Sequence, residues 1–76
     1  MSGLVNKRIA LNLRDTRLMR NYSQEYLALQ LKISQNAYSK MEMGRTLITV
    51  ETVFKIADIL EVDVNTLLNI KQLTVA

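Results

Sequence analysis

Hydrophobic positions along this chain recur at intervals of three and four residues, which is the spacing of amphipathic helices. The clearest example is the stripe formed by Val53, Ile56, Ala57 and Leu60. Pro is absent and Gly occurs twice, so the turn residues typical of an all-β chain are missing. The pattern therefore predicts an all-α fold. The predicted helices span about residues 4–20, 24–31, 35–43, 50–60 and 64–69, after a frayed start at residues 1–3.

Side chains that cap helices mark the boundaries of these segments. A Ser, Thr or Asp before a helix accepts a hydrogen bond from the free N–H groups of its first turn. An Asn or Gly after a helix tolerates the left-handed conformation of a tight end. The expected N-caps are Ser23, Ser34, Thr49 and Asp63, and the expected stops are Asn21 and Gly44.

Each predicted helix has an apolar face that we expect to be buried. Leu47 and Ile48 lie in a loop before the fourth helix, where they either pack onto the domain or contact another copy of the chain. The expected inward residues are Ile9, Leu13, either Leu18 or Met19, Leu27, Ala28, Leu31, Ala37, Tyr38, Met41, Val53, Ile56, Ala57, Leu60, Leu67 and Leu68.

The third predicted helix has two chemically different faces when it is placed on a wheel at about 100° per residue. Gln35, Asn36, Ser39 and Lys40 share one arc, which lies opposite the apolar residues. Amide, hydroxyl and ammonium groups are the side-chain groups that bind base edges and phosphates. An ordinary solvated helix face has the same composition, so the arc alone leaves both interpretations open.

The composition excludes most kinds of catalytic chemistry. The 76 residues contain neither Cys nor His, which removes thiolate and imidazole catalysis and nearly every zinc site. The carboxylates are scattered and there is no Gly-rich phosphate loop, so we expect no enzyme, no metal and no cofactor. No apolar run approaches the roughly 18 residues of a membrane span, so we expect no membrane association and a cytoplasmic location.

Positive charge is concentrated in the first part of the chain. The net charge is +3. Residues 1–45 carry eight Lys or Arg against three acids, whereas residues 46–76 carry two against four. A one-sided basic surface is typical of a protein that binds a polyanion. On charge alone, a chance imbalance on a solvated surface would look the same.

Three segments match a known family in order and spacing: RDTRLMRNYSQEYLA, ISQNAYSKMEMG and VETVFKIADILEVDVNTLL. Together they place the match at about residues 9–68, and on them the chain resembles the lambda-repressor-like, Cro/repressor-type helix-turn-helix proteins, also called the xenobiotic-response-element-like family. The resemblance implies a single DNA-binding domain folded as a compact bundle of five short helices. Here the domain would be 1–76, with a core at about 4–69 and a tail at 70–76.

The resemblance also implies roles for individual residues. The third predicted helix would lie in the DNA major groove, and the second would brace it across the backbone. The implied base contacts are Gln35, Asn36, Ser39 and Lys40. The implied phosphate contacts are Ser23, Gln24 and Lys32, with the backbone around Met43 and Arg45. Arg17 and Glu42 match a pair that in many members forms an ion pair between the first and third helices.

The chain departs from the family pattern in its turns. Many members have Gly where this chain has Lys32 and Glu61, and a non-Gly residue at positive φ costs about 1 kcal/mol. The usual Pro-containing loop is replaced by Thr46, Leu47 and Ile48. Leu47 and Ile48 are therefore candidates for a dimer contact.

By resemblance, we expect a sequence-specific transcriptional regulator that binds double-stranded DNA at the nucleoid, as a homodimer on a near-palindromic operator. It would act as a repressor by occlusion, or as an activator that contacts polymerase, and the sequence does not choose between the two. The alternative is an antitoxin-like module that uses the same fold to bind a protein partner. In that case the tail or the Leu47–Ile48 loop would contact the partner.

Overall fold

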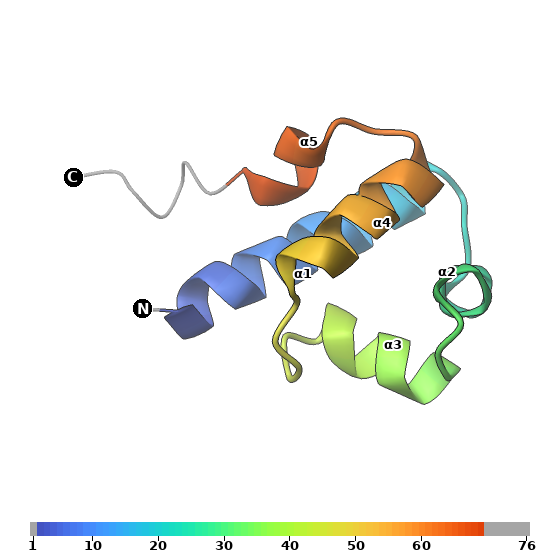
Figure 1. The fold of residues 1–76 in the computed structure, drawn as a ribbon, viewed down its shortest axis with the longest axis horizontal. Helices are drawn as coiled ribbons and strands as arrows, with labels where there is room; N and C mark the ends of the chain where they lie inside the picture. Colours follow the sequence, from blue (N-terminus) through green and yellow to red (C-terminus); the bar gives the residue numbers. More distant parts are fainter. Residues whose placement is uncertain (1, 70–76) are drawn as a thin grey trace.

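The computed structural model describes residues 2–69, except for the side chain of residue 2, and its described residues form helices and connecting turns. The all-α prediction is confirmed, although the first helix begins at residue 2 and not at residue 4. The predicted tail at 70–76 lies outside the described residues. Within the described part of the chain, no helix is both long and apolar enough to cross a membrane. The helices are α1 (Ser2–Met19), α2 (Gln24–Leu31), α3 (Gln35–Glu42), α4 (Val50–Leu60) and α5 (Val64–Leu68) (Figure 1).

The four later helices each begin after the capping residue expected from the sequence. In every case the side-chain oxygen of the cap accepts a hydrogen bond from a backbone N–H of the first turn, which satisfies one of the donors left free at a helix start. Ser23 accepts from Tyr26, Ser34 from Ala37, Thr49 from Thr52, and Asp63 from Asn65.

The turns after α2 and α4 adopt the left-handed conformation without glycine. Lys32 has φ 61° and Glu61 has φ 58°, beside φ 73° at Gly44. The next amide in each turn donates back into the helix, from Ile33 to the carbonyl of Ala28 and likewise after α4. The turns therefore keep the geometry that a glycine would favour. Each of the two non-glycine residues costs about 1 kcal/mol in backbone strain.

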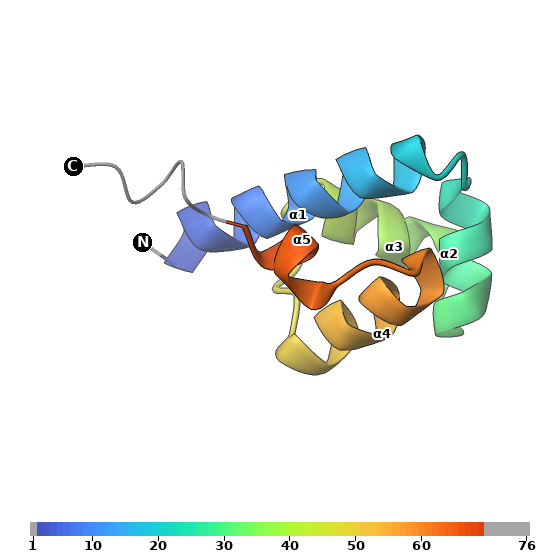
Figure 2. The same cartoon turned by 90° about the horizontal axis from the view of Figure 1, so that it is seen from above.

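Helix α1 is central to the packing and contacts α3, α4 and α5. In Figure 1, α4 lies in front of α1, with α5 above the two helices and α3 below them. The view from above shows α2 closing one end of the bundle, where it contacts α3 and α4 (Figure 2). This arrangement leaves one long side of α3 without a covering element.

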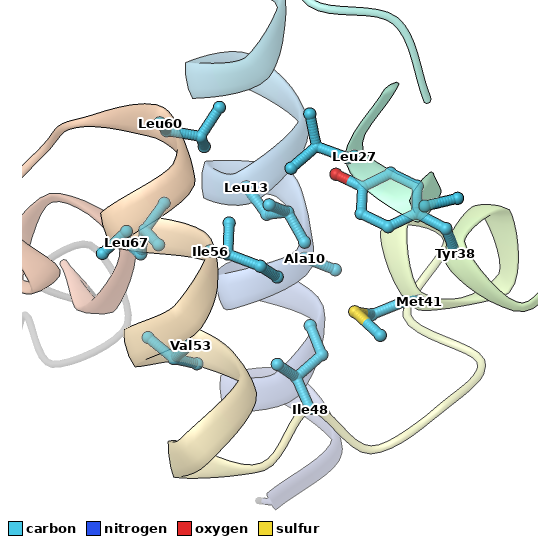
Figure 3. Close-up of a cluster of buried hydrophobic side chains, with 12 residues drawn as sticks. Ala10, Leu13, Leu27, Tyr38, Met41, Ile48, Val53, Ile56, Leu60 and Leu67 are labelled. Atoms are coloured by element: carbon cyan, nitrogen blue, oxygen red, sulfur yellow. The ribbon is translucent and has the colours of Figure 1, made fainter. Parts of the chain in front are cut away.

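The core lies between α1, α4 and the helix pair α2–α3 (Figure 3). The predicted stripe on α4 is buried along its whole length, and Leu27 and Ala28 of α2 are buried against it. Leu31 and Ile9 are partly buried at its edge. The largest fully buried side chains are Tyr38, Leu13, Leu27, Ile56, Leu60 and Leu67.

Several expected inward residues face solvent instead. Leu18 and Met19 are exposed because the inward face of α1 at this level is taken by Thr16 and Arg17, so the next two positions turn away. The error therefore came from assigning the buried face of α1 to apolar residues alone.

At Ala37, Leu68 and Leu47, the adjacent residue in the chain takes the inward position. Ala37 is exposed because the adjacent Tyr38 fills the core, and Leu68 is 37% exposed because Leu67 takes the buried place. In the α3–α4 loop the two apolar residues separate: Ile48 is 8% exposed and Leu47 is 71% exposed. Ile48 therefore belongs to the core and is not available as a dimer contact.

Two asparagines of α1 hold the α3–α4 loop and the end of α5 in place. The buried Asn6 donates to the carbonyl of Thr46 at 3.0 Å and accepts from the amide of Ile48 at 2.8 Å, which pins the α3–α4 loop. Asn12 donates to the carbonyls of Leu67 and Asn69, which holds the end of α5. These four bonds satisfy backbone groups that the α3–α4 loop and the end of α5 would otherwise leave without a partner.

Candidate nucleic-acid interface

The polar arc of α3 is presented to solvent by the burial of the opposite face. Tyr38 is 0% exposed, and its ring reaches from α3 toward Leu27 of α2 and the adjoining α1 (Figure 3). Met41 is buried one turn further on. With these two side chains anchored, the outer arc of α3 faces away from the bundle. Of its residues, Gln35, Asn36 and Lys40 are exposed and Ser39 is half-buried.

An ion pair between α1 and α3 fixes the orientation of α3. The Arg17 guanidinium donates to both carboxylate oxygens of Glu42, through Nε to Oε2 and through Nη2 to Oε1 at 3.0 Å. Its Nη1 donates to the carbonyl of Tyr22 at 2.7 Å, and Gln24 Nε2 donates to Glu42 Oε1 at 2.9 Å. The side chains of Arg17 and Glu42 are almost fully buried. The network thus joins α1, the start of α2 and the end of α3.

The ionisation of this network follows from its contacts. Burial alone would raise the pKa of Glu42, but the polar groups of Arg17, Tyr38 and Gln24 outweigh burial and hold this pKa below its usual value. The hydrogen bond to Glu42 raises the pKa of Arg17 despite its desolvation. Burial, with Glu42 nearby, raises the pKa of the Tyr38 hydroxyl. At neutral pH the pair is therefore fully charged.

The first backbone N–H groups of the loop after α3 are already hydrogen-bonded to carbonyls of α3. The amides of Met43, Gly44 and Arg45 donate to the carbonyls of Ser39, Met41 and Lys40. A phosphate at this loop would therefore be held by side chains, of which Arg45 is exposed. The expected role of the backbone around Met43 and Arg45 in binding phosphate does not fit this conformation.

A groove of about 600 Å³ runs between α1 and α3 beside the polar arc. Its α1 side carries two exposed cations, Lys7 and Arg14, with Leu11 between them. Its floor includes the Arg17–Glu42 pair. The groove is lined by Lys7, Leu11, Arg14, Arg17, Gln24, Ser39, Glu42 and Met43.

A family model described as helix-turn-helix matches residues 13–67, which is more than half of the chain. The chain belongs to the Cro/C1-type, lambda-repressor-like helix-turn-helix family. It is accordingly a DNA-binding transcription regulator, of a family that is typically not enzymatic. No curated protein and no solved structure matches the chain. In the helix-turn-helix arrangement, α2 and α3 are the two motif helices, and α3 holds the position that the motif gives to its recognition helix.

The structure brings some of the expected phosphate-contacting residues next to α3 of the helix-turn-helix. Gln24 lies in the groove beside Ser39, and its side-chain N–H₂ donates to Glu42. Since this amide is already bonded, a phosphate there would meet the backbone N–H groups at the start of α2. Ser23 caps that helix start and is exposed. Lys32 lies elsewhere, in a hollow between α2 and α4 beside Asp58.

Two basic residues that line the groove, Lys7 and Arg14, were not predicted as site residues from the sequence. Neither is among the residues for which the sequence predicts a DNA contact. The available signal was the spacing of Lys7, Leu11 and Arg14, which places all three within one arc of α1. That spacing shows a shared face, but it cannot show that the face borders α3.

Proposed function

We propose that this chain is a repressor that binds a near-palindromic operator as a homodimer, with α3 of each copy in the major groove. The observation that carries the proposal is the outward polar arc of α3, anchored by Tyr38 from behind and by the Arg17–Glu42 pair at its end. A rigidly held helix is needed because base readout depends on placing donors and acceptors accurately in the groove.

The chemistry of the arc fits base edges. Gln35 and Asn36 each carry an amide, which pairs with adenine N6 and N7, and Lys40 carries an ammonium group that suits guanine O6 and N7. Ser39 adds a hydroxyl that can donate or accept. The half-site should therefore contain both A·T and G·C pairs. Repression would follow from occlusion of the promoter by the bound dimer.

Binding should be strongly salt-dependent, because phosphate neutralisation releases condensed counterions. If a dimer contacts roughly six to ten phosphates, affinity should fall by about 10³–10⁵-fold between about 50 and 200 mM salt. Fluorescence anisotropy with a labelled duplex measures this fall directly. An affinity that does not change with salt would contradict DNA binding by this surface.

An exposed apolar patch next to α3 is the proposed dimer surface. It consists of Leu47, Val50 and Phe54, on the α3–α4 loop and the first turns of α4. Leu47 and Val50 are 71% and 72% exposed although they are only three residues apart in the chain. Because the loop leads directly from α3, two copies that meet here would hold their recognition helices near each other, as a two-fold operator requires.

Leu47→Glu should therefore shift the chain from dimer to monomer and raise the dimer Kd by at least about tenfold, since it places a charge in a desolvated contact. Sedimentation equilibrium measures the change. Met19→Glu is the matched control, because Met19 is an apolar residue of α1 outside the patch and is exposed at least as much as Leu47. A monomeric wild type on and off DNA, or equal effects of both variants, would contradict this surface. Co-purification of a small protein partner that competes with self-association would instead favour the antitoxin-like alternative.

A further inference from the structure

We propose that the Lys7–Leu11–Arg14 ridge of α1 is an additional binding surface for the DNA sugar–phosphate backbone, resting on the function proposed above. The ridge would extend each protomer's contact beyond the bases that face α3. It would add affinity without adding base preference, because phosphates are the same at every sequence.

The geometry of the ridge follows from helical spacing. Lys7, Leu11 and Arg14 are separated by four and three residues, so they lie within about 60° on α1. All three line the groove whose opposite wall includes Ser39 of α3 and Met43, the residue that follows this helix. The ridge is therefore the surface of α1 that adjoins the recognition helix, and a duplex seated on α3 passes close to it.

The charge of this groove is positive. Its one carboxylate, Glu42, is neutralised by Arg17 through two hydrogen bonds. Lys7 and Arg14 form no ion pair within the described residues, and both are exposed. Two uncompensated cations on a helix face beside a DNA-binding helix suit the polyanionic backbone.

The position of Lys7 links the ridge to the loop after α3. A Cβ atom built at Gly44 would meet Lys7 Cγ at 3.0 Å, so the aliphatic stem of Lys7 lies directly against this glycine. The lysine stem is thereby held beside the loop, with its ammonium group within reach of a phosphate placed there. Because the amides of residues 43–45 already donate to α3, Lys7 supplies positive charge that those amides cannot offer. Lys7 also precedes the family match at 13–67. The contact between Lys7 and Gly44 therefore comes from the part of α1 that lies before the matched residues.

The test is the salt dependence of duplex binding by Lys7→Met and Arg14→Met. Methionine keeps an unbranched stem, which preserves packing against Gly44 and Leu11 while removing the charge. Each variant should reduce the slope of log K against log salt by about 0.9 per protomer and weaken binding several-fold at moderate salt. The loss should be equal on a preferred site and on a random duplex. Circular dichroism of each variant checks that the fold is kept.

Lys55→Met is the matched control, because it removes one charge from α4, where Lys55 pairs with Glu51 at 3.6 Å on the surface. A wild-type slope in both ridge variants, or an equal loss in Lys55→Met, would overturn the ridge and leave the assignment of α3 intact. If the wild-type protein itself shows no salt-dependent duplex binding, the proposed function fails together with the ridge.

Discussion

Glu42→Gln should lower the free energy of unfolding by about 3–5 kcal/mol at neutral pH. The change leaves Arg17 buried with its charge uncompensated, and it weakens the bond from Gln24 that joins α2 to the same carboxylate. Urea denaturation followed by circular dichroism measures the loss. A domain of this size is only marginally stable, so the variant should be largely unfolded at physiological temperature.

The exposed pair between Glu51 and Lys55 provides the control. Its atoms are 3.6 Å apart and both side chains are solvated, so Glu51→Gln should change stability by less than about 0.5 kcal/mol. A loss of the same size in both variants would mean that burial of the Arg17–Glu42 pair has no special effect.

The destabilisation by Glu42→Gln should also depend on pH. The folded-state pKa of Glu42 is lowered, so its stabilising effect is present above its unfolded-state pKa of roughly 4.3 and is lost as pH falls through the folded value. The difference in unfolding free energy between wild type and variant should therefore shrink below about pH 4. A constant difference between pH 7 and pH 3 would show that the charge of Glu42 is not what stabilises the fold.

Lys40→Ala and Gln35→Ala should each weaken binding to the preferred DNA site by about 1–3 kcal/mol, which is roughly 5- to 150-fold. Both side chains lie on the outward arc of α3, where they would contact base edges, so each loss should be confined to particular base pairs. Binding measured on a panel of sites with single substitutions gives the position at which discrimination disappears. Because both residues are exposed, stability should change little.

Arg45→Ala is the informative comparison for these variants. Arg45 is exposed in the loop after α3, and its loss should weaken all sequences alike and leave the base preference unchanged. If the two α3 variants behaved in the same sequence-independent way as Arg45→Ala, α3 would be a backbone-binding helix and not the reading helix.

The positions of the helices could be predicted because local chemistry determines them. Ser23, Ser34, Thr49 and Asp63 cap helices through bonds within three residues of themselves, so the signal and its consequence lie in the same short segment. The stripe on α4 was predictable for a related reason, since its apolar residues are numerous enough to define one face without knowledge of the partners.

The inward face of α1 could not be predicted from its apolar residues. That helix turns a charged residue, Arg17, and an amide, Asn6, toward the bundle, because each finds its partner in a segment remote along the chain. Leu18 and Met19 then lie outside. Long-range partners of this kind decide orientation, and periodicity carries no information about them.

The candidate site was predicted in part through family resemblance. The polar arc of α3 could be identified from its periodicity, but the choice between a solvated face and a reading face came from the matching segments. Neither periodicity nor family resemblance could identify Lys7 as a site residue. It precedes the matched residues, and its packing against Gly44 exists only in the folded chain.

The central claim is that the polar arc of α3 reads a DNA sequence, and selection of bound sites from a pool of random duplexes by the wild-type protein tests it most directly. We predict enrichment of a near-palindrome whose half-sites are centred about 10 base pairs apart and contain both A·T and G·C pairs. Lys40→Ala should then lose preference at one symmetric pair of positions. A pool that shows no enriched sequence after repeated selection would contradict the claim.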